Sequence, residues 1–331
     1  MIPIMASSSS QAVGGGVPRL VVAIATYNGR EMLEIVLPSL RRQTFRDFRV
    51  VVVDDASSDG TVEWLAEHWP QVEVVAHPRN RGVSVALNSC LRAGPSEFVA
   101  LLNNDVELEP DCLGELVAAL SEHPEAGAAC GKLLNYSRRE LLDGAADVYS
   151  WGGSARRRGK GLRDRGQYDT PQEVFSVCAA AAVYRRAALD AVGLFDERFF
   201  FNYEDVDWCF RAQLAGWSCR YVPSAVGYHM SSATIGSAAN QFKLYHNWRN
   251  QTWVVAKNYP AGALLRHAPE LAYTQMRNLA LAVRIRRPSL WLRVWRDVLA
   301  GMPAVLAERR RIQASRTRTS AELDRLIGLD R

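Results

Sequence analysis

The sequence predicts an α/β fold, in which a mostly parallel sheet is flanked by helices and followed by a helical C-terminal extension. Three observations predict it. Near-continuous apolar runs alternate with segments of helical periodicity over residues 19–110, as in sheets buried on both faces. Polar clusters follow directly after several of these runs. From about residue 240 onward the pattern is helical and rich in arginine and tryptophan.

The composition is that of a globular protein. The 331 residues suit one large domain or two ordinary ones. Hydrophobic residues make up 48% and charged residues 23%, which excludes disordered, collagen-like and fibrous classes. The sequence contains no run of roughly 18–20 apolar residues, so it predicts no membrane-spanning helix. Residues 1–17 are expected to form a flexible tail rather than a secretory signal. The six cysteines are scattered, which predicts reduced thiols and a cytoplasmic protein.

The first half of the chain alternates strand and helix patterns. The apolar run at 19–26 is typical of a doubly buried strand and is followed by an Asn-Gly turn and a helical pattern at 31–42. Further strands are expected at 49–53 and 72–76, and a fourth directly before the Asn/Asp cluster at 103–105. Four such strands separated by helices predict a mostly parallel sheet with helices on both faces.

The second half is less regular. Residues 135–172 are rich in Gly, Arg and Asp and predict a long loop or a short antiparallel excursion. Residues 175–193 predict a strand that leads into a helix, and another helix begins near Glu204 and ends at Gly216. Residues 219–234 predict a final strand with a polar loop. We therefore expect a tail at 1–17, an α/β domain at 18–238 and a basic helical region at 239–331.

Polar residues lie where the ligand crevice of such a sheet is expected, beyond the carboxyl ends of its strands. Asp105 is a candidate ligand for Mg²⁺ or Mn²⁺, which prefer carboxylates and phosphate oxygens. Asn103 and Asn104 can hydrogen-bond sugar or phosphate. Asp54 and Asp55 can accept hydrogen bonds from a nucleobase or a ribose. The alternatives are that these residues only form turns or cap helices.

A second acidic cluster follows an aromatic segment, FFFNYED. A carboxylate at Glu204 or Asp205 that is partly shielded from water can act as a general base. Acidic residues in the first turn of a helix are also favoured by the helix dipole alone. His229 follows the last predicted strand and is either a structural histidine or a second ligand for the cation at Asp105.

The charge is distributed unevenly. From residue 236 onward the chain has 17 Lys/Arg and 6 Asp/Glu, whereas the remainder has 23 and 29. The basic helices predict either packing against the body or a second subunit, or a surface that meets an anionic membrane. Nucleic-acid binding is not expected, because no recognition motif accompanies the charge.

Together these motifs resemble those of the inverting nucleotide-sugar glycosyltransferases of family two, which have the GT-A fold. Within that family the chain is most similar to the rhamnosyltransferase and galactofuranosyltransferase-like group. The resemblance covers about residues 20–250. The residues that carry it, in the order of the family, are VVAIATYNGREMLEIVLPSLRRQT, VVVVDDASSDGT, NRGVSVALN, LLNNDVELEP, GLFDERFFFNYEDVDWCFRAQLAGW, YHMSSAT and KLYHNWRN.

The resemblance implies roles for individual residues. It implies that Asp205 is the catalytic base with Glu204 beside it, and that Asp105 and His229 bind the metal. Asn103 stands where many relatives have Asp, so the metal site carries less negative charge than theirs. The residues implied to surround the nucleotide sugar are Thr26, Asn28, Asp54, Asp55, Asn80, Asn88, Asn103 and Asn104.

The resemblance also implies a reaction. A sugar moves from a nucleoside diphosphate sugar, dTDP-rhamnose first and UDP-sugars next, to a hydroxyl of a glycan or lipid-linked acceptor in cell-surface polysaccharide synthesis. Mg²⁺ or Mn²⁺ offsets charge on the leaving diphosphate, and one displacement inverts the anomeric carbon. The implied location is the cytoplasm, at the inner face of the membrane if the basic helices bind lipid. The chain lacks the Q-x-x-R-W motif of processive relatives, which favours one or a few sugar additions.

Two other functions remain open from the sequence. A nucleotidyltransferase would also place metal-binding carboxylates after sheet strands, but a Gly-rich basic loop is expected after its first strand, where this chain has TYNGRE. A protein that binds nucleotide sugars without transferring them is the other alternative. Dispensability of Asp105 or Asp205 would favour that second alternative.

Overall fold

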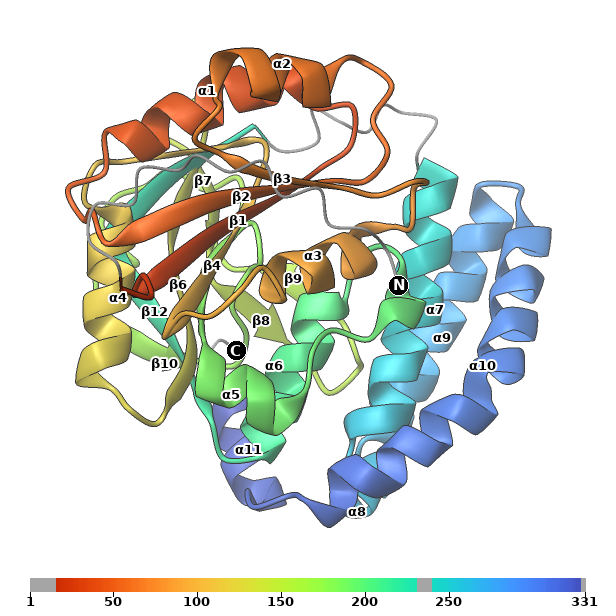
Figure 1. The fold of residues 1–331 in the computed structure, drawn as a ribbon. Coiled ribbons are helices and arrows are strands. Elements are labelled where there is room, and N and C mark those ends of the chain that lie inside the picture. Colours follow the sequence, from red (N-terminus) through yellow and green to blue (C-terminus); the bar gives the residue numbers. More distant parts are fainter. Residues whose placement is uncertain (1–15, 231–239, 329–331) are drawn as a thin grey trace.

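A ten-stranded mixed sheet forms the centre of the computed structural model, which describes residues 16–230 and 240–328 (Figure 1). Its strand order is β10-β12-β6-β11-β4-β1-β2-β3, with β5 paired to β12 and β7 to β6. β8 and β9 form a separate two-stranded sheet. The strands are β1 Leu20–Thr26, β2 Phe48–Asp54, β3 Glu73–Ala76, β4 Phe98–Asn103, β5 Val106–Leu108, β6 Ala126–Asn135, β7 Leu142–Ala145, β8 Asp147–Tyr149, β9 Ala155–Arg157, β10 Gln172–Val174, β11 Ala181–Arg185 and β12 Ser218–His229.

The four strands expected from the apolar runs form one parallel block. β1 pairs in parallel with both β2 and β4, and β2 pairs in parallel with β3. β11 is antiparallel to β4 and β6, which makes the sheet mixed. The α/β prediction with a mostly parallel sheet is therefore confirmed.

Helices cover both faces of the sheet (Figure 1). Apolar side chains of α1, α2 and α4 join one core cluster, and those of α3, α5 and α6 join the other. The helices are α1 Arg30–Arg41, α2 Thr61–His68, α3 Val83–Leu91, α4 Cys112–Glu122, α5 Arg186–Val192, α6 Glu204–Leu214, α7 Asn240–Asn258, α8 Ala261–Arg266, α9 Ala268–Arg284, α10 Pro288–Ala314 and α11 Ser320–Gly328.

The sequence of β1 is apolar up to its last residue and does not alternate between apolar and polar residues as a half-exposed strand would. Its side chains point alternately to the two faces of the sheet, as strand geometry requires. Leu20, Val22 and Ile24 enter the first core cluster, whereas Val21 and Ala23 enter the second. Both faces are covered, so an unbroken apolar run is stable here.

The irregular segment at 135–172 contains the antiparallel excursion that its composition predicts. β7, β8, β9 and β10 are strands of three or four residues, and each is paired antiparallel. The last predicted strand, at 219–234, ends at His229 as β12. Its predicted polar loop falls largely on 231–239, outside the described residues.

The basic C-terminal region is helical, as predicted, and its helices share a core with the α/β body. α7, α9 and α10 lie side by side (Figure 1), and α7 packs against both α6 and α10. One buried cluster includes Tyr149 and Phe210 from the body together with Trp253, Val298 and Leu323 from the C-terminal helices. Among the described residues, no helix combines the length and apolarity needed to cross a bilayer.

Candidate active site

The carboxyl ends of β1 and β4 are joined by a buried hydrogen bond. Asn104 Nδ2 donates to Thr26 Oγ1 at 2.9 Å. Gly29 lies against this pair, and a Cβ at that position would overlap both side chains. A glycine is thus needed in the turn after β1, because the backbone approaches the polar floor of the crevice too closely for any side chain.

The two aspartates at the carboxyl end of β2, Asp54 within the strand and Asp55 after it, have different surroundings, although both are buried. Asp55 accepts hydrogen bonds from the backbone N–H groups of Arg81 and Gly82 at 2.9–3.0 Å and pairs with His77 Nδ1 at 2.7 Å. Asp54 accepts from Ser57 N through Oδ2 at 2.9 Å. Its Oδ1 atom is buried without a hydrogen-bond partner among the described residues. Asp54 therefore has a free acceptor, whereas Asp55 anchors the loop after β3.

The remaining asparagines predicted for the donor site lie in different environments. Asn28 and Asn80 are exposed, and each accepts a backbone N–H in the loops at the edge of the crevice. Asn103 is half-buried at the end of β4. Asn88 is buried in α3, where its amide exchanges two hydrogen bonds with the backbone of Phe195 at 2.9 and 3.0 Å. The Asn88 side chain is thus committed to holding the segment that leads to α6.

Asp105 and His229 form a buried pair. His229 is the last residue of β12 and lies opposite Val106 of β5, so the antiparallel register brings it beside Asp105. His229 Nε2 lies 3.2 Å from Asp105 Oδ1. The other ring nitrogen, Nδ1, is 2.6 Å from Asp143 Oδ2. Burial alone would lower the pKa of His229, but the hydrogen bonds to the two carboxylates outweigh burial and raise it.

This pair fits a hard divalent cation. Two neighbouring ligands of an octahedral ion at about 2.1 Å lie roughly 3 Å apart, close to the observed 3.2 Å. A carboxylate behind the second ring nitrogen orients a metal-binding histidine, and Asp143 is in that position. Asp105 and His229 are therefore the residues suited to hold Mg²⁺ or Mn²⁺.

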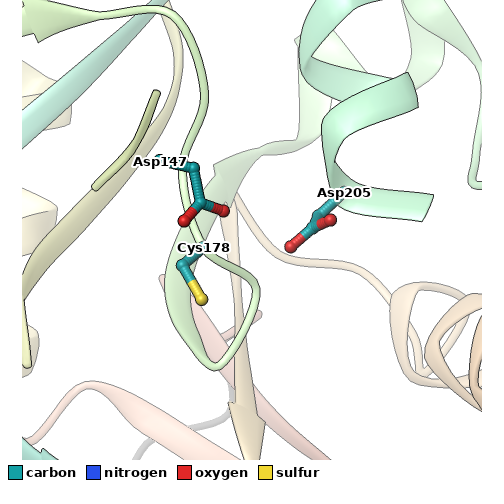
Figure 2. Close-up of side chains that lie close together, drawn as sticks. All are labelled: Asp147, Cys178 and Asp205. Carbon is teal, nitrogen blue, oxygen red and sulfur yellow. The ribbon is translucent and has the colours of Figure 1, made fainter. Parts of the chain in front are cut away.

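A second acidic group lies at the N-terminus of α6. Ligand-type atoms of Asp147, Cys178 and Asp205 all lie within 4.8 Å of one another (Figure 2). Burial raises the pKa of the Cys178 thiol to about 12, and hard cations prefer oxygen to sulfur. This set therefore suits proton exchange better than Mg²⁺ or Mn²⁺.

The carboxylates around Asp205 hold protons more strongly than exposed ones. Burial raises the pKa of Asp147 to about 7, and the charge of Asp205 adds to this shift. The same two causes raise the pKa of Glu204 to about 8. Burial also raises the pKa of Asp205, against backbone hydrogen bonds from Ala179 and Val206 that lower it. A carboxylate whose pKa is moved toward neutrality is a better proton acceptor.

Arg157 connects the two acidic groups. It forms an ion pair with Asp143, and its Nη1 atom lies 2.8 Å from His229 Nδ1. Its charge also interacts with Asp147 and Asp205. Arg157 thus links the cation-binding pair to the carboxylates at the N-terminus of α6.

A strained turn sets the position of Asp205. Phe200, Asn202 and Tyr203 all have positive φ angles, of 45°, 62° and 72°, which non-glycine residues rarely adopt. Asn250 of α7 holds this turn, because its Nδ2 atom lies 2.7–3.0 Å from the carbonyl oxygens of Phe199, Phe201 and Asn202. Phe200 O in turn accepts from Val83 N at 2.8 Å, which joins the turn to the start of α3.

Four residues that shape this site were not predicted from the sequence: Asp143, Asp147, Arg157 and Asn250. The first three lie in the irregular segment at 135–172, whose Gly/Asp/Arg composition was the only signal. Their side chains reach the site because of how the short strands β7, β8 and β9 pair. No motif in the sequence predicts that strand pairing. Asn250 lies in KLYHNWRN, which we noted as a family motif without assigning it a function.

A cavity of about 570 Å³ lies at the turn after β1 and the start of α1. It is lined by Asn28, Gly29, Arg30, Glu31, Met32, Glu34 and Asp59. None of the acidic residues Asp54, Asp105 and Asp205 borders it. Because Asn28 is among the residues predicted for the donor site, the cavity adjoins that predicted site without reaching these three carboxylates.

Comparison with known proteins places this geometry in a family. Residues 21–193 match the model of Glycosyl transferase family 2. The chain is 30% identical over 250 residues to N-acetylglucosaminyl-diphospho-decaprenol L-rhamnosyltransferase of Mycobacterium tuberculosis, covering 69% of this chain and 81% of the relative. It is 24% identical over 221 residues to poly-β-1,6-N-acetyl-D-glucosamine synthase of Staphylococcus epidermidis, covering 66% and 51%.

Solved structures share the fold. Mannosyltransferase PcManGT from Pyrobaculum calidifontis, in complex with GDP-Man and Mn²⁺, aligns with a TM-score of 0.57 at 19% identity, over 91% of this chain and 88% of that one. TarS 1–349 of S. aureus in complex with UDP aligns with a TM-score of 0.58 at 20% identity, over 90% and 87%.

The comparisons decide among the functions that the sequence left open. A family-model match over more than half of the chain and a long alignment with a rhamnosyltransferase favour glycosyl transfer over a nucleotidyltransferase or a non-catalytic binding protein. The GT-A fold predicted from the motifs is confirmed by the structural neighbours. The chain belongs to glycosyl transferase family 2 and is a glycosyltransferase.

Proposed function

We propose that this enzyme transfers a sugar, with inversion, from a nucleoside diphosphate sugar to a hydroxyl of a glycan or lipid-linked acceptor. dTDP-rhamnose is the first candidate donor and a UDP-sugar the second. The name of the M. tuberculosis relative, an L-rhamnosyltransferase for a decaprenol-linked acceptor, supports this choice. The GDP-Man and UDP in two structural neighbours support a nucleotide-linked donor.

One observation carries the proposal: Arg157 connects a cation-binding pair to a carboxylate with a raised pKa. Arg157 contacts His229 of the pair and interacts with the charge of Asp205. A glycosyl transfer by single displacement needs both features, because charge grows on the leaving diphosphate while the acceptor hydroxyl loses a proton.

The donor end of the crevice suits a nucleotide. Asp54 Oδ1 is buried and has no hydrogen-bond partner in the described part of the chain, so it can accept a hydrogen bond from a base N–H or a ribose hydroxyl. Asp55 acts through the loop at Arg81 and Gly82 rather than through a free oxygen. The residues assigned to the donor site are Thr26, Asn28, Asp54, Asp55, Asn80, Asn88, Asn103 and Asn104. Within this set Asn88 is a positioning residue, because its amide is bound to Phe195.

Asp105 and His229 would hold Mg²⁺ or Mn²⁺. The bound ion supplies Lewis-acid neutralisation of the departing diphosphate. Asn103 contributes an amide instead of a second carboxylate, so this chain offers the ion less negative charge. Asp143 keeps His229 in the orientation that turns Nε2 toward Asp105.

Asp205 would remove the proton from the acceptor hydroxyl. Two backbone N–H groups, of Ala179 and Val206, hold its carboxylate at 3.2 and 2.8 Å. Glu204 is more deeply buried and has an Oε2 atom without a partner among the described residues. Its pKa of about 8 keeps it protonated at neutral pH, which limits the repulsion that Asp205 experiences.

Replacement of the base tests the proposal. In Asp205→Asn we expect kcat to fall by about 10²–10⁴-fold, the usual contribution of general-base catalysis. The dissociation constant of the donor should stay within about threefold of wild type, because the base acts on the acceptor. Turnover is measured with dTDP-rhamnose and UDP-sugars, and donor binding is measured in parallel by calorimetry.

Asp190→Asn is the matched control, because Asp190 is exposed on α5. It should leave both quantities unchanged. Near-normal turnover of Asp205→Asn, with donor binding intact, would remove Asp205 from the role of base.

A further inference from the structure

The outward face of α9 is apolar along most of its length. Tyr273, Met276 and Val283 are 68%, 71% and 59% exposed, and Leu279 is 37% exposed. Ala272 and Ala280, also exposed, lie between them. At 3.6 residues per turn these six side chains share one side of the helix. We call this set, Ala272, Tyr273, Met276, Leu279, Ala280 and Val283, the α9 face.

The α9 face is the outer side of a helix whose inner side is already packed. Thr274, Asn278 and Ala282 are buried toward the body. Gly152 lies against Thr274, so closely that a Cβ there would crowd the threonine hydroxyl. The helix is therefore fixed in place, and its apolar side faces away from the protein. Contiguous exposed apolar surface of this kind marks an interaction site.

Arginines flank the α9 face and continue beyond the helix. Arg277 and Arg284 lie along one edge of the face, and Arg286 and Arg287 follow the last turn. Arg284, Arg286 and Arg287 form no ion pair within 16–230 and 240–328. Residues 261–300 contain seven arginines and two acidic residues. This excess of positive charge beside exposed apolar side chains is the pattern of a helix that lies in a membrane interface.

We propose that the α9 face binds the surface of an anionic lipid bilayer. Apolar side chains enter the boundary between headgroups and acyl chains, while the arginines remain at the level of the anionic headgroups. Charge decides against a second copy of the chain as the occupant. A two-fold interface would bring this arginine-rich surface against itself, and like charges across an interface oppose association.

One edge of the α9 face is joined to the strand that carries Arg157. Arg277 Nη2 donates to Ser154 Oγ at 3.4 Å. Ser154 directly precedes β9, whose Arg157 interacts with Asp147 and Asp205. A bilayer on the α9 face would thus hold a lipid-linked acceptor close to the base. This last step rests on the proposed function, whereas bilayer binding itself does not.

Vesicle flotation of the full chain tests the proposal. The probes are equimolar phosphatidylglycerol/phosphatidylcholine vesicles and pure phosphatidylcholine vesicles, without donor or acceptor. We expect flotation with the anionic vesicles, and weaker flotation at 1 M salt because salt screens the arginines (Debye length about 3 Å). In the double variant Met276→Ser/Val283→Ser the bound fraction should fall at least about tenfold.

The matched control is Val17→Ser/Leu162→Ser, which removes two exposed apolar side chains from the body, 65% and 54% exposed. It should float like wild type. Equal flotation of the α9 double variant and wild type would overturn the proposal. So would a dimer, detected by light scattering, that only the α9 variant dissociates. Turnover on a water-soluble acceptor should be the same in the α9 variant and in wild type. Absence of turnover in both proteins would count against the proposed function and not against bilayer binding.

Discussion

At the scale of single residues, the carboxylates around Asp205 determine how the site responds to pH. Asp147 is buried, and its Oδ1 atom has no hydrogen-bond partner among the described residues. It faces Asp205 and Cys178 (Figure 2). The charged groups that also act on Asp147 are Arg157, Asp143 and Lys160. Two carboxylates this close cannot both ionise without cost, so one proton stays on the pair near neutral pH.

This arrangement predicts a pH-dependent gain in stability for Asp147→Asn. The pKa of Asp147 rises from 3.8 to about 7 on folding. The folded protein then binds a proton that the unfolded chain has lost, so stability falls as pH rises from about 4 to 7. The neutral asparagine removes this loss of stability, and its amide can donate a hydrogen bond to Asp205. The variant should be more stable than wild type at pH 8, by on the order of 2–4 kcal/mol, and by less at pH 5.

Thermal unfolding at pH 5 and pH 8 measures the effect. The exposed Asp190→Asn serves again as the control, and its stability should follow wild type at both values. An Asp147→Asn protein that is less stable than wild type at pH 8 would show that the buried carboxylate is ionised and stabilised there.

The sequence predicted the residues of this site unevenly. Asp105 and His229 were predictable, because one follows a strand and the other ends one, and family motifs mark both. Asp55 was predicted to contact the nucleobase, yet its oxygens are used by Arg81, Gly82 and His77. Only the fold shows that the free oxygen belongs to Asp54. Asp147 could not be predicted, because its partner is 58 residues away in the chain.

At the scale of elements, the turn before α6 depends on α7. Three residues of this turn have positive φ, a conformation that costs about 1 kcal/mol or more each for non-glycine residues. Asn250 compensates by placing its amide NH₂ group within hydrogen-bond distance of three backbone carbonyl groups of the turn. Nearby, Lys257 of α7 bridges Asp196 and Asp207 at 2.7 and 2.8 Å, all three side chains being buried. α7 thus supports the N-terminal end of α6, where Asp205 lies.

Asn250→Ala should therefore weaken both folding and catalysis. It leaves buried carbonyl groups without donors, which costs about 2–4 kcal/mol. The turn can then relax and move Asp205, so kcat should fall about tenfold or more while donor affinity changes little. Urea unfolding and steady-state kinetics measure the two effects.

Thr252→Ala provides the comparison within the same helix. Among the residues that the structure describes, the Thr252 side chain bonds only to Trp248 O and Gln275, both outside the turn. A kcat for Asn250→Ala equal to that of Thr252→Ala would mean that the turn holds its shape without Asn250.

The elements themselves were largely predictable. Strands buried on both faces appear in the sequence as apolar runs. For this reason β1, β2 and β4 match the expected positions within about two residues. The short strands β7 to β10 were not resolvable beyond an antiparallel excursion. They have three or four residues each, too few for a periodic pattern, and they are set by pairing with distant partners.

At the scale of the whole molecule, the C-terminal helices complete the core of the body. Trp253 and Tyr259 of the α7 segment are buried among side chains of the body and of α10. Tyr259 packs edge-on against Trp151 with ring centroids 4.9 Å apart. The basic region is therefore an integral part of the fold, although its positive charge distinguishes it from the rest of the sequence.

Truncation tests this dependence. A chain that ends at residue 260 loses α8 to α11 and exposes the apolar sides of α7 that α10 covers. We expect it to lose the sharp near-ultraviolet circular dichroism of the full chain and its cooperative thermal transition. A truncated protein that unfolds cooperatively, with a near-ultraviolet spectrum like that of the full chain, would mean that the body is stable alone.

The central claim is that Asp105 and Asp205 serve one reaction, Asp105 through the cation and Asp205 through the acceptor. Calorimetric titration with dTDP and with UDP, with and without Mn²⁺, tests it most directly. In wild type and in Asp205→Asn, Mn²⁺ should tighten binding of the preferred nucleotide at least about tenfold, and in Asp105→Asn it should not. Full Mn²⁺ enhancement in Asp105→Asn, or its loss in Asp205→Asn, would contradict the account.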